Sequence, residues 1–167
     1  MADLDDRDYE AIGRVVVACA GVEVIVLPIL AAMMNMHEGM AQIAFSDRGH
    51  AWVLDALEDA VNLEVTAVAL QQDWVKWVRD AKGVNRRRNT IIHAQWLAPW
   101  RPGDDTMLSA RLMSEGRREG LSRRRKGLTI EYSSRRSLNA LATAADDLSR
   151  RLSELVRRTP GLLAQRD

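Results

Sequence analysis

Cysteine and histidine are scarce in this chain of 167 residues, which has one cysteine, Cys19, and three histidines. A single cysteine excludes an intrachain disulfide and a zinc site built from several thiols, and it fits a reducing, cytoplasmic compartment. No H-E-x-x-H or other paired-histidine pattern occurs. We therefore expect no metal and no cofactor, although His37 and His50 have the acidic neighbours Glu38 and Asp47.

The chain also lacks the signs of a targeted or a disordered protein. Its first six residues, MADLDD, are acidic where a secretory signal would be basic. Apolar residues make up 47% of the sequence and charged residues 28%, which is the mixture of a soluble globular protein with a sizeable core. The length fits a single domain over residues 1–167.

One long apolar run, residues 15–34, has the length of a membrane span. Glu23 and Pro28 lie in its middle, and a charged side chain at that depth in a bilayer is costly. The rest of the sequence contains no second run of this kind. We expect a helix within a bundle and no membrane contact, and we keep a small membrane-associated protein as an alternative.

Helical spacing of apolar residues predicts an all-α protein of about five helices. Acidic residues precede a first helix over about residues 6–37, and its seam has the a/d-like spacing of three and four residues. This seam, in which Glu23 is the one charged member, consists of Tyr9, Ile12, Val16, Cys19, Glu23, Val26, Leu30 and Met33.

Capping and breaking residues set the bounds of the other helices. Ser46–Gly49 caps a helix that ends near Asn62, and Gly83 ends the next helix. Asn85 caps a short helix to about Leu97. The last helix begins at Ser134 and ends at Pro160, with its a/d seam formed by Leu138, Leu141, Ala145, Leu148, Leu152 and Leu155.

Residues 103–133, before the last helix, have the alternating pattern of a small β-hairpin insertion. Its connection is rich in glycine and in basic residues, so the hairpin carries a basic arm. We expect this arm to be an RNA contact or a spacer. Its last basic run is Arg123, Arg124, Arg125 and Lys126.

The charges are divided unevenly between the two halves of the chain. Residues 1–84 carry 14 acidic and 6 basic side chains, whereas residues 85–167 carry 9 acidic and 18 basic ones. Such asymmetry indicates a polyanion, first of all nucleic acid, as a partner of the C-terminal half. Arginine supplies 21 of the 24 basic residues, so genomic base composition and a solvated surface are the alternative explanation.

The sign of the charge changes at the run Arg86-Arg87-Arg88-Asn89-Thr90-Ile91-Ile92-His93. At 3.6 residues per turn, Asn89 and His93 lie one turn apart on a helix face that Arg86 shares. Arg88 lies about 140° around the helix from His93, so the two would converge best on a ligand held between helices or between subunits. The pattern predicts a group of side chains that binds phosphate. The alternative is a structural role, in which His93 packs against the rest of the protein and the arginines form a solvated helix face.

Within this run, Arg88-Asn89-Thr90-Ile91-Ile92-His93 is similar to the R-N-x-x-x-H form of the R-x(4 to 6)-H motif of the HEPN superfamily. These all-α proteins include many metal-independent ribonucleases of toxin–antitoxin and other prokaryotic defence systems. The order of the expected helices resembles a HEPN bundle over residues 7–97 and 134–158. Arg86, Arg87 and Arg88 all satisfy the loose spacing, and the asparagine that follows points to Arg88.

Cleavage of RNA without a metal requires proton transfer from the ribose 2′-hydroxyl, proton transfer to the 5′-oxygen, and stabilisation of the phosphate charge. His93 is our candidate for the general acid or base, and Arg88 for the phosphate-stabilising group. Arg86 or Arg87 would assist Arg88, and Asn89 would orient His93 or bind a phosphate oxygen. Glu23 is expected to be a buried acid bonded to a neighbouring helix, or a carboxylate that sets the tautomer of His93.

The resemblance implies RNA as the substrate, a homodimer with a composite site, and an antitoxin or other regulatory protein as a further partner. A HEPN-type fold without catalysis, used for dimerisation or RNA binding, is the alternative function.

Overall fold

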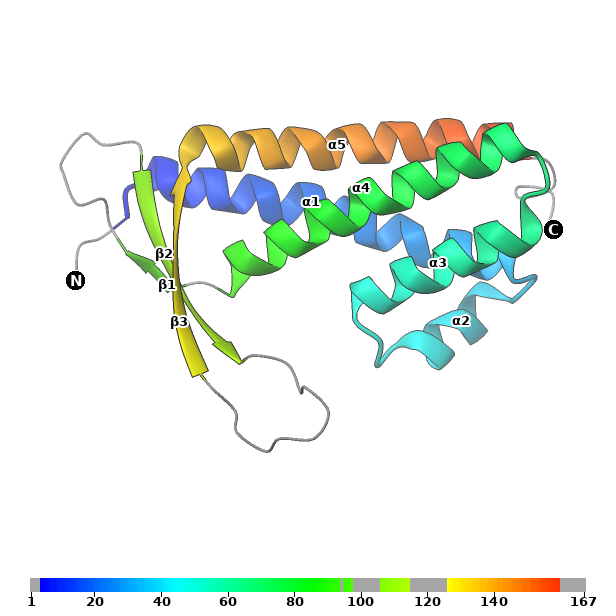
Figure 1. Cartoon of the computed structure of the whole chain (residues 1–167), viewed down its shortest axis with the longest axis horizontal. Helices are drawn as coiled ribbons and strands as arrows, with labels where there is room; N and C mark the ends of the chain where they lie inside the picture. Colours follow the sequence, from blue (N-terminus) through cyan, green and yellow to red (C-terminus); the bar gives the residue numbers. More distant parts are fainter. Residues whose placement is uncertain (1–3, 94, 98–105, 115–125, 160–167) are drawn as a thin grey trace.

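The computed structural model describes residues 4–93, 95–97, 106–114 and 126–159 (Figure 1). Within these ranges the protein is a bundle of five helices with a small β-insertion before the last helix, as predicted. The sheet lies at one end of the bundle, and the two shorter helices lie toward the other end. The helices are α1 (Asp6–Met33), α2 (Glu38–Phe45), α3 (His50–Glu64), α4 (Val68–Ile92) and α5 (Arg135–Arg158).

Helix α1 begins at a capping box, in which the Asp5 carboxylate accepts from the Asp8 amide and the Asp8 carboxylate accepts from the Asp5 amide. Its predicted seam is only partly right, because Tyr9 and Val16 are exposed, at 60% and 37%. A strict a/d spacing assumes 3.5 residues per turn, whereas a straight helix has 3.6. The predicted a/d seam and the face that is buried therefore do not coincide along the whole of a long helix. The buried face is Ala11, Val15, Cys19, Val22, Val26, Ile29, Leu30, Ala31 and Met33, with Asp8 at its start.

The first helix is shorter than expected, and a short second helix follows it. The backbone of Asn35 has a φ of 50°, a left-handed conformation that stops a helix. Helix α2 then begins after His37, whose Nδ1 accepts a hydrogen bond of 3.1 Å from the Gly39 amide. The prediction of one helix to residue 37 was therefore wrong. The sequence did not reveal the boundary, because a lone capping histidine is a weak signal.

Helix α4 is continuous where two helices were expected. Gly83 lies inside it, and Asn85 is a buried helical residue with 6% exposure instead of a cap. A glycine inside a helix costs only about 1 kcal/mol, which the continuous burial of one helix face outweighs. That face comprises Leu70, Trp74, Trp77, Val78, Ala81, Asn85 and Ile91.

The chain leaves the helical conformation after Ile92, so the expected extension of the helix to Leu97 was wrong. Instead Gln95–Leu97 forms strand β1, which pairs antiparallel with β2 (Thr106–Ser114). Strand β2 pairs antiparallel with β3 (Lys126–Ser134), which leads directly into α5. The expected hairpin is present, with β1 as an additional edge strand in the order β1-β2-β3.

The core is one cluster of buried residues from α1, α3, α4 and α5. Trp74 and Trp77 are fully buried, and both indole N–H groups are satisfied. Trp77 donates to the Leu148 carbonyl at 2.9 Å, and Trp74 donates to the Thr159 hydroxyl at 2.9 Å. These two bonds fix α4 against α5 and therefore fix the helix that carries the motif.

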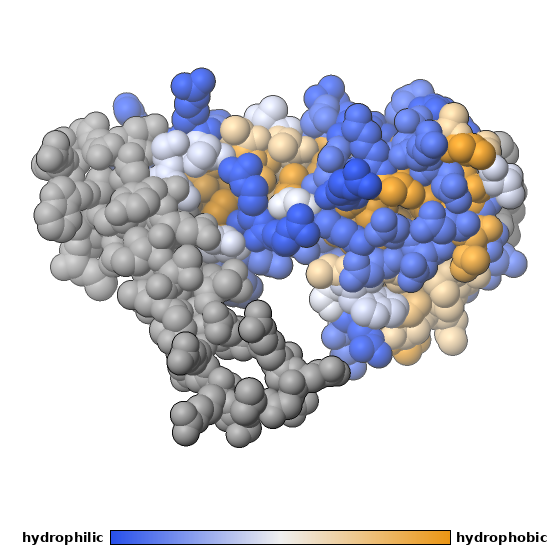
Figure 2. Space-filling model, viewed as in Figure 1, coloured by the Kyte–Doolittle hydropathy of each residue, from blue (hydrophilic) through white to orange (hydrophobic). Residues whose placement is uncertain are grey.

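A second apolar face of α1 lies at the surface and contains Val17, Val24 and Ile25, which are 73%, 73% and 40% exposed. Among the described residues α1 is the one helix long and apolar enough to cross a membrane. Of its most apolar stretch of 18 residues, 39% is buried inside the protein. Core helices of soluble proteins also meet this criterion. Apolar atoms are also visible at the surface over α2 (Figure 2), where Met40 and Ile43 are exposed.

Candidate functional site

Arg88 lies in the C-terminal part of α4 and reaches toward α1. Its Nη2 is 3.6 Å from Oε1 of Glu23, and its Nη1 donates a hydrogen bond of 2.9 Å to Oδ1 of Asn89. The side chains of Arg88 and Glu23 are 22% and 28% exposed, so water screens their interaction only in part. The fold thus brings together Arg88, Asn89 and Glu23, three of the residues that the sequence singled out.

The guanidinium of Arg88 has unused hydrogen-bonding capacity. It carries five N–H donors, of which one is bonded to Asn89, and the contact with Glu23 is longer than a normal hydrogen bond. Its Nε is buried and has no hydrogen-bond partner in the described part of the chain. Buried donors are rarely left unpaired, so this group is a candidate for binding a ligand with acceptor oxygens.

His93 is the C-cap residue that follows Ile92, the last residue of α4, and its side chain is exposed. Its backbone amide bonds to the carbonyls of Asn89 and Ile91, while no hydrogen bond or ion pair within the described residues involves its imidazole. His93 follows Arg88 by five positions, with four residues between them, and this separation places the two side chains about 140° apart around α4. Arg86 and Arg87 are exposed as well, outside the contact between Arg88 and Glu23.

The expected role of Glu23 is corrected in part. The carboxylate does contact a neighbouring helix, as one of the two alternatives expected, through an ion pair with Arg88 of α4. Its side chain is 28% exposed, so it is half-buried and not buried as expected. The basic residues Arg123, Arg124 and Arg125 lie outside the described residues, and Lys126 is the first residue of β3.

His50, which the sequence did not single out for this site, belongs to the same electrostatic environment. It is the first residue of α3 and is half-buried. Loss of solvent lowers the pKa of His50, Arg88 lowers it further, and Glu23 acts in the opposite direction. A single histidine after a glycine gives no sequence signal for this placement, because only the packing of α3 against α1 and α4 creates it.

Cys19 lies one turn before Glu23 on α1 and is only 4% exposed. Burial raises the pKa of its thiol to about 11, with Arg88 opposing the shift and Glu23 and Asp146 adding to it. The thiol is therefore protonated at neutral pH, which makes it a poor nucleophile and a poor metal ligand.

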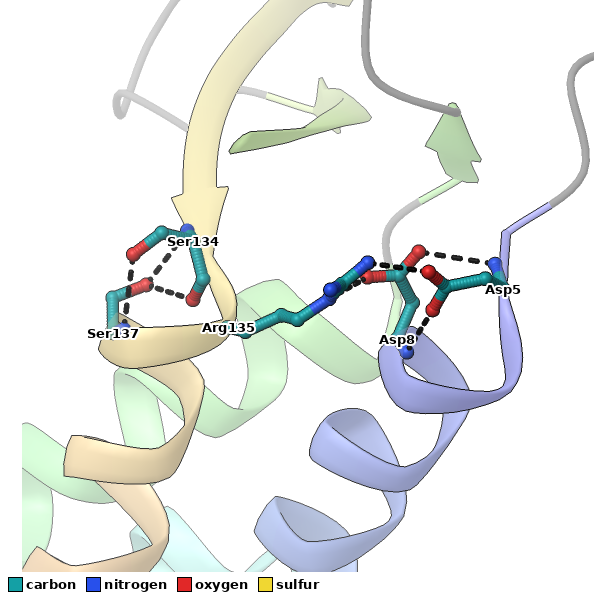
Figure 3. A network of polar contacts seen from close by, with 5 residues as sticks. All are labelled: Asp5, Asp8, Ser134, Arg135 and Ser137. Atoms are coloured by element: carbon teal, nitrogen blue, oxygen red, sulfur yellow. Dashed lines mark hydrogen bonds and ion pairs between the residues drawn. The ribbon is translucent and has the colours of Figure 1, made fainter. Parts of the chain in front are cut away.

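A second polar cluster lies where the N-terminal ends of α1 and α5 meet (Figure 3). Arg135 donates from Nε to Oδ1 of Asp8 and from Nη2 to Oδ2 of Asp5, each at 2.6 Å. The neighbouring Ser134 and Ser137 form the capping box of α5. Asp8 is 2% exposed, and its negative charge at this depth is matched by the guanidinium. This cluster joins two helix ends and has the character of a structural contact.

Within the described ranges, no three His, Cys, Asp or Glu side chains gather as metal ligands would. Comparison of the chain with protein-family models, with curated proteins and with solved structures finds no match. The HEPN resemblance therefore depends on the residues of the motif and on the order of the elements around it.

Proposed function

We propose that the protein is a metal-independent endoribonuclease of the HEPN type, active in the cytoplasm as a homodimer. The observation that carries this proposal is the state of Arg88, a half-buried guanidinium with donors that the described residues do not use. A guanidinium stays charged at physiological pH and binds phosphate oxygens through paired N–H donors. Arg88 would therefore stabilise the negative charge that develops on a phosphodiester during cleavage.

His93 transfers a proton in this proposal, as imidazole is the side chain best suited to acid–base catalysis near neutral pH. Its exposure at the end of α4 leaves it accessible to a polynucleotide. Asn89 holds the guanidinium of Arg88 in place through the bond to its amide oxygen. Arg86 and Arg87, both exposed, attract the neighbouring phosphates.

The proposed homodimer has two supports. Arg88 and His93 of one protomer point in directions about 140° apart, so a site that uses both is completed more easily by a second protomer. The apolar face of α1, formed by Val17, Val24 and Ile25, is exposed, and a subunit interface would cover it. An antitoxin or another regulatory protein would restrain such an enzyme in the cell.

A HEPN-type dimerisation or RNA-binding module without catalysis is the second candidate. It is favoured by the ion pair between Arg88 and Glu23, which reduces the net charge available to a phosphate. In that case Arg88 has a structural role and His93 has none in chemistry.

RNA cleavage in excess chelator distinguishes the two candidates. Purified protein is incubated with transfer RNA and with total RNA in EDTA, beside Arg88→Ala, His93→Ala and the control Arg150→Gln. Arg150 is 76% exposed and, among the described residues, pairs with Asp147 of its own helix, so the control should retain wild-type activity. We expect each site variant to lose on the order of 10²-fold or more in rate. The absence of cleavage by the wild type, or equal cleavage by all four proteins, would exclude the enzyme.

A further inference from the structure

Charged and titratable side chains from three neighbouring helices share one electrostatic environment in the bundle. Glu23 comes from the middle of α1, His50 begins α3, and Arg88 lies in the C-terminal part of α4. Helix α1 packs against both α3 and α4, which also pack against each other. Lys82 of α4 pairs with Asp55 of α3 at 2.6 Å, so the first turns of α3 lie beside the C-terminal half of α4, as Figure 1 shows. Arg88 and Glu23 form an ion pair, and the same two residues act on the titration of His50.

The environment of His50 favours the neutral imidazole. Burial penalises the charged form, and the positive guanidinium of Arg88 penalises it further. His50 also occupies the first position of a 15-residue helix, where the positive end of the helix dipole disfavours a cation. Burial and Arg88 lower the pKa of His50, and Glu23 limits the shift. The imidazole therefore keeps a lone pair that can accept a proton at neutral pH.

The chemistry assigned to this site has one role without a residue. Metal-independent cleavage of RNA needs a base for the 2′-hydroxyl and an acid for the 5′-oxygen, and His93 can perform only one of these tasks at a time. We propose that His50 is a further catalytic residue of the Arg88 site, the base that accepts the proton of the ribose 2′-hydroxyl. This inference rests on the ribonuclease function proposed above.

The proposed step balances in protons and electrons. The 2′-hydroxyl gives its proton to the free nitrogen of His50 while its oxygen forms a bond to phosphorus. The bond between phosphorus and the 5′-oxygen breaks, and that oxygen takes a proton from the imidazolium of His93. The products are a 2′,3′-cyclic phosphate and a 5′-hydroxyl, and water returns the two histidines to their starting states. No metal, oxidant or further reactant is needed.

Glu23 has a defined part in this step. Before reaction its carboxylate is 3.6 Å from Nη2 of Arg88. As His50 becomes an imidazolium, Glu23 stabilises the new positive charge, and Arg88 can turn its donors toward the phosphate. Glu23 and Arg88 are the charged groups that act on His50 from the helices packed against α3. Glu23 is thus a positioning residue, and its charge should set the pH at which His50 loses its function.

The pH profile of RNA cleavage tests this assignment. We expect His50→Gln and His50→Asn to lose on the order of 10²-fold in kcat, with the acidic limb of the kcat/KM profile abolished. The variant Glu23→Gln should move that limb to lower pH, because Glu23 raises the pKa of His50. NMR titration of the His50 imidazole should show the same movement without any RNA. His37→Asn is the matched histidine control, since asparagine retains the helix cap, and its profile should equal the wild type.

The outcomes separate this inference from the function on which it rests. If the wild type does not cleave RNA, the proposed function fails and the role of His50 falls with it. If cleavage depends on Arg88 and His93 while His50→Gln and His50→Asn keep the wild-type rate and pH profile, the function stands and His50 is not the base. Thermal unfolding shows whether each variant is folded. If one of the two His50 variants does not fold, the other one still tests the role of His50.

Discussion

Arg88 and Arg135 are two arginines of similar exposure, 22% and 26%, in two differently built clusters. Arg135 makes contacts of 2.6 Å to two different carboxylates, one of which is almost fully buried. Arg88 has one carboxylate at 3.6 Å and a buried Nε without a described partner. The saturated guanidinium connects the ends of two helices, whereas the under-used one has donors left for a ligand. The geometry of the donors, rather than burial, distinguishes the structural arginine from the candidate functional one.

The largest expected effect is on folding, at the Arg135 cluster. Arg135→Ala leaves the buried carboxylate of Asp8 without its counter-charge, and loss of one partner of a buried pair typically costs about 3–5 kcal/mol. Urea denaturation should show this loss. The neighbouring Arg136 is exposed, and Arg136→Ala should change the free energy of unfolding by no more than about 0.5 kcal/mol. Equal effects of the two substitutions would contradict a structural role for Arg135.

The next largest effect is at Arg88, where the expectation is the reverse of that for Arg135. Arg88→Gln should affect activity far more than stability. A half-exposed ion pair of 3.6 Å contributes at most about 1 kcal/mol, so denaturation should be nearly unchanged. RNA cleavage should fall on the order of 10²- to 10³-fold, because a preorganised donor to the developing charge is lost. A variant that is strongly destabilised would instead place Arg88 with Arg135 as a structural residue.

The smallest effect is the acid sensitivity of the Arg135 cluster. Desolvation favours protonated Asp5, but the Asp8 amide, the charge of Arg135 and the Arg7 amide outweigh it and lower the pKa of Asp5. A carboxylate with a lowered folded-state pKa stabilises the protein above its unfolded pKa of about 3.9, and this stabilisation is lost as the pH falls through the folded value. The free energy of unfolding should therefore decrease less below pH 4 in Asp5→Asn than in the wild type. If the free energy of unfolding has the same pH dependence in both proteins, ionised Asp5 does not stabilise the Arg135 cluster.

Long helices with one strong periodic face were predictable from the sequence. The seam expected for α5, from Leu138 to Leu155, is buried at every named position, and Ser134 is its cap. Local signals failed where packing outweighed them. Gly83 and Asn85 looked like a helix boundary, yet the burial of Ala81 on one side and Ile91 on the other keeps α4 in one piece.

The candidate site was predictable only in its parts. Arg88, Asn89 and Glu23 were singled out by residue type and spacing, but the pairing of Glu23 with Arg88 depends on how α1 crosses α4. His50 could not be found in this way, because it is 38 residues before Arg88 in the sequence and no motif connects the two. Tertiary packing alone places both in one electrostatic environment.

The availability of Arg88 for phosphate is the central claim, and NMR of the arginine Nε–H groups tests it most directly. Protein labelled with ¹⁵N is titrated with a short RNA that carries 2′-O-methyl groups and therefore cannot be cleaved. We expect the Nε–H resonance of Arg88 to shift and reach saturation, while that of Arg135 stays in place. If the Arg88 resonance does not respond, or if both resonances respond alike, Arg88 is not the phosphate-binding arginine of this protein.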